Sequence, residues 1–118
     1  MLPKLQLLKA QICAAFVAGA MVSMAGALWA AASQEYLVSQ AGRKFTPGEL
    51  VINRAETIQI LNDDGDLLHH VFIESRQMNF DSGDQTPGSR TPITFPIAGD
   101  FTVLCAIHPK MKLFVHVR

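Results

Sequence analysis

Residues 99–117 read Gly-Asp-Phe-Thr-Val-Leu-Cys-Ala-Ile-His-Pro-Lys-Met-Lys-Leu-Phe-Val-His-Val, and this stretch decides the fold. Its first part, Phe101 to Cys105, is rich in β-branched and apolar residues, which predicts a strand. Its last part, Leu113 to Val117, alternates with period two, which predicts a second strand with one buried face. A short loop that contains Cys105, His108 and Met111 therefore lies between two strands.

The residues upstream continue this pattern of short strands and turns. Thr57 to Leu61 alternates with period two, and Val71 to Ile73 is β-branched and aromatic, so both are predicted strands. Residues 62–66 predict a turn, and the polar residues 79–88 predict a long loop. Thr91 to Ile97 contains two prolines, which predicts a strand at the edge of a sheet. No part of this region has a helical period, and about seven or eight short strands predict an all-β fold, a β-sandwich.

The first part of the chain has the features of an export segment. Lys4 and Lys9 are its only charges, and the apolar stretch Ile12 to Ala32 lies beyond them. The small residues Ala30-Ala31-Ala32 at its end are typical of a cleavage site, so we expect a secretory signal with Ser33 as the first mature residue. An uncleaved membrane anchor is the alternative, because about 20 apolar residues suffice to span a bilayer.

The chain thus divides into a hydrophobic export helix, residues 1–32, and one folded domain, residues 33–118. The 118 residues include ten Lys and Arg and ten Asp and Glu, so the formal net charge is zero. Nucleic-acid-binding proteins usually have a basic surplus, so a net charge of zero argues against this class. The domain keeps one of the two cysteines, Cys105, which has no partner for an internal disulfide. Cys105 is therefore a free thiol, part of an intermolecular disulfide or a metal ligand, and the sequence leaves all three possibilities open.

The spacing Cys-x2-His-x2-Met in residues 105–111 indicates a metal site. A thiolate, an imidazole and a thioether in one short loop can converge on one ion, and soft sulfur ligands with imidazole suit copper best. Two histidines, one cysteine and a long axial methionine form the site of electron-transfer copper. The second histidine must come from elsewhere, and His69 and His70 open a predicted strand upstream.

Over most of residues 35–118, the sequence resembles the cupredoxins, the small type 1 blue copper proteins, and among them the amicyanins and plastocyanins most. The matching pieces are Asn62-Asp63-Asp64, Thr94-Phe95, Ala98-Gly99-Asp100-Phe101 and the loop from Cys105 to Met111. The short loop, with Pro109 directly after the histidine, is most similar to that of the amicyanins.

The resemblance implies a Greek-key sandwich that holds one copper ion through His69, Cys105, His108 and Met111. His69 matches the upstream histidine of the family. His70 stands where the family has an asparagine that ties the two ligand-bearing segments together, which leaves that bond in question and keeps His70 as an alternative ligand. Adjacent strand residues point to opposite faces, so only one of the two histidines is expected to bind the ion.

The resemblance further implies an exported, periplasmic electron carrier that is monomeric, is not an enzyme and shuttles single electrons between transient redox partners. A c-type cytochrome and an amine dehydrogenase are the partners it suggests, with membrane contact only if the export segment stays uncleaved. His108 is expected to be the electron port, inside an apolar patch, with Lys110 and Lys112 beside it. Two alternatives remain: a periplasmic copper carrier or chaperone, and a metal-free sandwich that serves as an interaction module.

Overall fold

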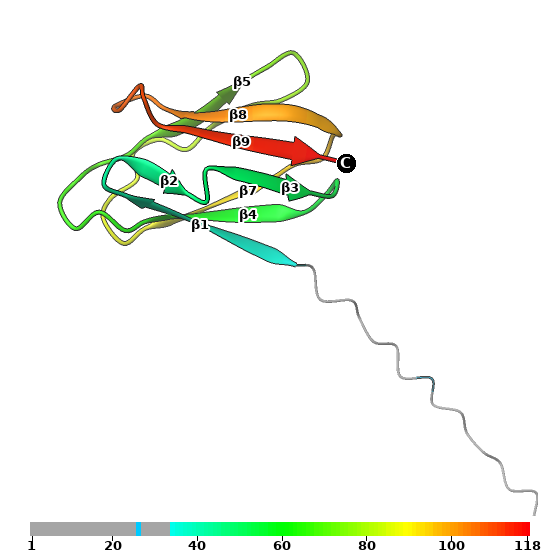
Figure 1. Ribbon diagram of the computed structural model, residues 1–118, viewed down its shortest axis with the longest axis horizontal. Helices are drawn as coiled ribbons and strands as arrows, with labels where there is room; N and C mark the ends of the chain where they lie inside the picture. The colour runs from blue at the N-terminus through cyan, green and yellow to red at the C-terminus, as the bar shows by residue number, and fades with distance from the viewer. Residues whose placement is uncertain (1–25, 27–33) are drawn as a thin grey trace, which may run out of the picture. The chain divides into compact units, whose positions relative to one another are not determined.

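The computed structural model describes residue 26 and residues 34–118. In chain order the strands are β1 (Glu35–Ala41), β2 (Lys44–Thr46), β3 (Glu49–Ile52), β4 (Thr57–Asn62), β5 (Val71–Glu74), β6 (Asn79–Asp81), β7 (Arg90–Thr94), β8 (Gly99–Cys105) and β9 (Lys112–Val117). They form one sheet in the order β2-β1-β4-β7 and another in the order β3-β9-β8-β5-β6 (Figure 1). The described residues contain no helix, so the predicted all-β fold is confirmed, with nine strands instead of seven or eight.

The alternation of apolar and polar residues gives each sheet one apolar face, and these faces form the core. Ile58 and Ile60 of β4 are fully buried, as is Val115 of β9. The buried rings of Phe95 and Phe101 pack against each other with centroids 5.6 Å apart. Each such side chain contributes about 1.5–3 kcal/mol when it leaves water, so the two sheets hold each other in place.

Strand β7 lies at the edge of the four-stranded sheet, as its prolines predict. It pairs only with β4, where Pro92 lies opposite Gln59. A proline has no backbone N–H to donate to a second neighbouring strand. At the edge of the sheet there is no such neighbour, so no hydrogen bond of the sheet is lost.

Two segments differ from the sequence prediction. Residues 79–88 were expected to form one loop, but Asn79–Asp81 make the short strand β6, which pairs with β5 at the edge of the other sheet. A strand of three residues is too short to show a period-two alternation, so the sequence did not indicate β6. Asn62 was expected in a turn, but it is the last residue of β4 and fully buried, because its side chain bonds to buried backbone groups.

The predicted export segment, residues 1–32, lies outside the described residues apart from Gly26, and its assignment stays a prediction. Within the described part of the chain, no helix has the length and apolar character needed to cross a membrane.

Candidate metal centre

Two strands of the five-stranded sheet bring distant parts of the sequence together at one end of the sandwich. β8 ends at Cys105, which pairs with Val71 at the start of the antiparallel strand β5. The loop after β8 and the loop before β5 therefore lie at the same end (Figure 1). The N–H of Ala106 donates to the carbonyl of His70 at 2.8 Å, so a backbone bond joins the two segments at the position where the family asparagine is missing.

Three of the predicted ligand side chains meet there. The Nδ1 atoms of His69 and His108 each lie 3.8 Å from Cys105 Sγ and 3.2 Å from each other. His69 is fully buried, Cys105 is 2% exposed and His108 is partly exposed. Two nitrogens and one sulfur around a single point, with ring planes tilted by 60°, are able to hold a metal ion.

Met111 is buried in the core at the end of the same loop. Its N–H donates to the carbonyl of His108 at 2.9 Å, which closes the loop into a tight turn. Its role as a fourth, axial ligand stays a prediction.

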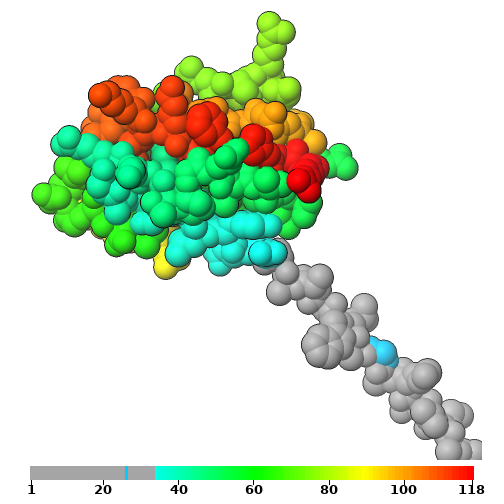
Figure 2. Space-filling model, in the orientation of Figure 1, coloured from blue at the N-terminus to red at the C-terminus, as the bar shows by residue number. Residues whose placement is uncertain are grey.

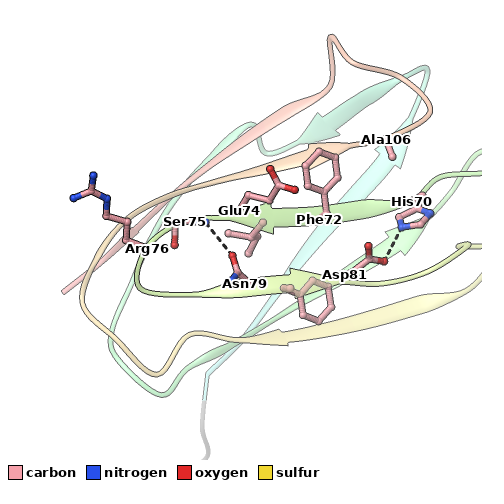
Figure 3. A pocket seen from close by; sticks show the side chains of 10 residues that line it. His70, Phe72, Glu74, Ser75, Arg76, Asn79, Asp81 and Ala106 are labelled. Atoms are coloured by element: carbon pink, nitrogen blue, oxygen red, sulfur yellow. Dashed lines mark hydrogen bonds and ion pairs between the residues drawn. The ribbon is translucent and has the colours of Figure 1, made fainter.

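His70 points away from this cluster. Its Nε2 lies 2.6 Å from Asp81 Oδ1, and its Nδ1 lies 3.5 Å from Asp84 Oδ1. Figure 3 shows His70 and Asp81 at one end of an open groove over β5 and β6, with Phe72 farther along it. The structure therefore brings His69, and not His70, to Cys105 and His108.

Asp64 is a site residue that the sequence did not reveal. Its Oδ2 lies 2.6 Å from Nε2 of His69, and its Oδ1 accepts the N–H of Gly42 at 2.8 Å. Burial alone would raise the pKa of Asp64, but the N–H donors of Gly42 and Arg43 and the His69 imidazole together hold the pKa below its usual value. In the sequence Asp64 is one of several aspartates in a polar turn, where a solvated side chain is the ordinary expectation, so no local pattern distinguished it.

Asn62 and Gln85 hold the loop that carries His69. The Nδ2 of Asn62 donates to the carbonyl of Leu67 at 2.8 Å and to that of Gln85 at 2.9 Å. The backbone of Gln85 in turn exchanges two hydrogen bonds with His69. These bonds fix the backbone of His69 on both sides, and the long-range pairing that makes them has no signature in the sequence.

The partly exposed edge of the site is His108. A hollow of about 410 Å³ lies over it, lined by Arg43, Ile107, Pro109, Lys110 and Met111. The turn between β1 and β2 and the loop after β8 border each other on the surface shown in Figure 2. Burial, the neighbouring His69 and the positive charge of Arg43 lower the pKa of His108, which favours the neutral imidazole that a metal requires.

No protein-family model matches the chain, and no curated protein sequence matches it. Solved structures do match. A Cu(I) amicyanin mutant is 21% identical, with a TM-score of 0.65, over 71% of this chain and 82% of that one. A purple cupredoxin from Nitrosopumilus maritimus is 20% identical, with a TM-score of 0.62, over 70% of this chain and 99% of that one.

A copper-containing nitrite reductase from Thermus scotoductus is 28% identical, with a TM-score of 0.65, over 72% of this chain. The chain spans only 22% of that enzyme's length.

Proposed function

We propose that this chain, which has the cupredoxin fold, binds one copper ion through His69, Cys105 and His108, with Met111 as the axial ligand, and carries single electrons. The observation that supports the proposal is the convergence of one thiol and two imidazole Nδ1 atoms within 4.8 Å of one another.

The chemistry of the donors fits copper. A soft thiolate and two imidazoles are the ligands that copper prefers, and a buried thioether at the end of the loop completes the set expected for a type 1 site. Among the residues that the structure describes, Cys105 has no disulfide partner, so its sulfur is free for a metal. A copper ion in this position would supply the one-electron chemistry, since it can exist as Cu(I) and Cu(II).

The protein's own residues keep the site rigid and dry. The pairing of β5 with β8 and the bonds of Asn62 hold His69 and Cys105 in place, and the burial of both side chains excludes water. A site whose shape is the same in both oxidation states needs little rearrangement when an electron moves. His108, with one edge toward the hollow, is the route by which the electron enters and leaves.

The surroundings of His108 suit a transient partner. Ile107 is 43% exposed beside it, and Lys110 and Lys112 are exposed on the same loop and the start of β9. Weak redox encounters bury little area, so an apolar rim with a few cations suffices to hold and steer an acidic partner surface.

A c-type cytochrome and an amine dehydrogenase remain the proposed partners of a monomeric, periplasmic protein that is not an enzyme.

A visible and EPR spectrum of the copper-loaded domain, residues 33–118, tests the proposal. We expect an intense thiolate-to-copper band, which Cys105→Ser should abolish. The matched control is His70→Gln, which should keep the band because His70 lies outside the cluster. A domain that stays colourless with cupric salt, or binds copper without sulfur, would contradict the proposal.

Two further measurements address the finer points. A slow rate of copper loss to a chelator favours a carrier of electrons over a carrier of copper. The mass of the protein from a cell's periplasmic fraction shows whether cleavage occurs before Ser33, and a full-length mass from the membrane fraction would overturn the signal peptide.

A further inference from the structure

The carboxylate of Asp64 links His69 to the turn between β1 and β2. Asp64 Oδ2 lies 2.6 Å from Nε2 of His69, while Oδ1 accepts a hydrogen bond from the N–H of Gly42 in the turn between β1 and β2. Its own backbone N–H donates to the side chain of Asn62 at 3.0 Å. The side chain is only 11% exposed, so this carboxylate has a fixed position and orientation.

The turn that Asp64 contacts is a tight hairpin turn. Gly42 and Arg43 both have positive φ, 62° and 58°, as a two-residue hairpin turn between Ala41 and Lys44 requires. The backbone N–H of Gly42 donates to Asp64 Oδ1 at 2.8 Å. Arg43 also lines the hollow over His108, so Asp64 connects the buried ligand with the exposed edge of the site.

An imidazole has two nitrogens, and a neutral ring carries its proton on only one of them. An ionised carboxylate can only accept a hydrogen bond, so a ring bonded to it places the proton on the bonded nitrogen. For His69 that nitrogen is Nε2, which leaves the lone pair on Nδ1. Nδ1 is the atom that faces Cys105 and His108.

We propose that Asp64 is a positioning residue, which holds His69 with its proton on Nε2 and its Nδ1 lone pair directed at Cys105 and His108. As it concerns metal affinity, this inference rests on the proposed function. Partners of this kind orient a ligand and increase its basicity, and their removal typically costs about 10–100-fold in metal affinity.

The first test uses the metal-free domain, residues 33–118, and NMR of ¹⁵N-labelled histidine, which reports which ring nitrogen bears the proton. In the wild type, His69 should be protonated on Nε2. A wild-type His69 protonated on Nδ1 would overturn the proposal without any variant.

The second test is Asp64→Asn, which has nearly the same shape. Its single amide oxygen can accept from His69 or from Gly42, but its NH2 group must then face the other donor. We expect a mixture of His69 tautomers or a displaced Gly42 amide resonance. We also expect a 10–100-fold loss of Cu(II) affinity in a competition titration.

The matched control is Asp63→Asn, which removes the same charge from the exposed neighbouring aspartate. It should leave the tautomer unchanged and the affinity within about twofold of the wild type, far from the 10–100-fold loss expected for Asp64→Asn. Equal losses in both variants would show a general charge effect and refute positioning by Asp64. An Asp64→Asn variant with the wild-type tautomer and affinity would refute it as well.

The outcomes separate the two proposals. Failure of the wild type to bind copper rejects the proposed function, while the tautomer measurement on the metal-free domain still decides the role of Asp64. Copper binding that is indifferent to Asp64→Asn rejects only the positioning role.

Discussion

Gln40 and Gln85 form a polar pair inside the sandwich. Both side chains are almost fully buried, and Gln40 Nε2 donates to Gln85 Oε1 at 2.9 Å. Gln85 Nε2 in turn donates to Thr91 Oγ1 at 2.7 Å. A chain of buried bonds of this kind is costly to interrupt, because each freed group stays out of reach of water.

We therefore expect Gln85→Leu to lower the free energy of unfolding by about 1–3 kcal/mol, since it leaves Gln40 Nε2 without an acceptor. The double variant Gln40→Leu/Gln85→Leu should recover part of this loss. Urea denaturation of the metal-free domain measures both. Losses that simply add would show that the pair does not act as a unit.

Met111 can be tested separately as a core residue and as a ligand. Met111→Leu conserves volume at this buried position, so the free energy of unfolding of the metal-free domain should fall by less than about 1.5 kcal/mol. If Met111 is the axial ligand, the same variant should change the EPR spectrum and the reduction potential of the copper form. Unchanged copper properties would assign Met111 to the core alone.

Individual residues differed in how far the sequence could predict them. Cys105, His108 and Met111 lie within seven residues, so their spacing indicated a common site. The two adjacent histidines come just before β5, and only His69 reaches the cluster, while His70 lies against Asp81. The role of Asp64 could not be predicted from the sequence. Its partner Gly42 lies 22 residues away, and only the tertiary structure brings the two together.

At the scale of elements, His116 joins three strands on the outer face of the five-stranded sheet. Its Nδ1 lies 2.7 Å from Asp100 of β8, and its Nε2 lies 2.6 Å from Glu49 of β3. The hydrogen bonds to Asp100 and then Glu49 raise the pKa of His116 above its ordinary value. Both acids belong to other strands, so the sequence around His116 does not indicate them.

The raised pKa gives a pH dependence with a definite sign. Protonated His116 stabilises the fold fully below the unfolded-state pKa of about 6.5, and this contribution disappears as pH rises through the higher folded-state pKa. The difference in unfolding free energy between the wild type and His116→Gln should therefore shrink as the pH is raised. Denaturation curves at several pH values measure it, and a difference that grows with pH would contradict the assignment.

The strands were predicted where their residues alternate, as in β4 and β9, or where β-branched and apolar residues follow one another, as in β8. β6 was missed because it has three residues and is defined only by its pairing with β5. The edge position of β7 was predicted correctly, since proline chemistry excludes a second neighbour whatever the rest of the fold.

At the scale of the whole domain, the cluster joins the loop before β5 to the loop after β8, so metal binding should stabilise the folded domain. Free metal at 100 times its dissociation constant adds about 2.7 kcal/mol to the stability of a protein that binds only when folded. We expect copper to raise the Tm of the wild type and a chelator to reverse the rise. Cys105→Ser should show a much smaller shift, and an equal shift would place the metal elsewhere.

The position of β9 has a consequence for how the protein is made. β9 comes last among the strands of the described residues, yet it lies between β3 and β8 inside its sheet. A ribosome delivers it after all the others, and until it inserts, the loop from Cys105 to Met111 is tethered at one end only. A nascent chain therefore cannot present a finished cluster, and we expect any metal to be delivered to the completed domain after its synthesis.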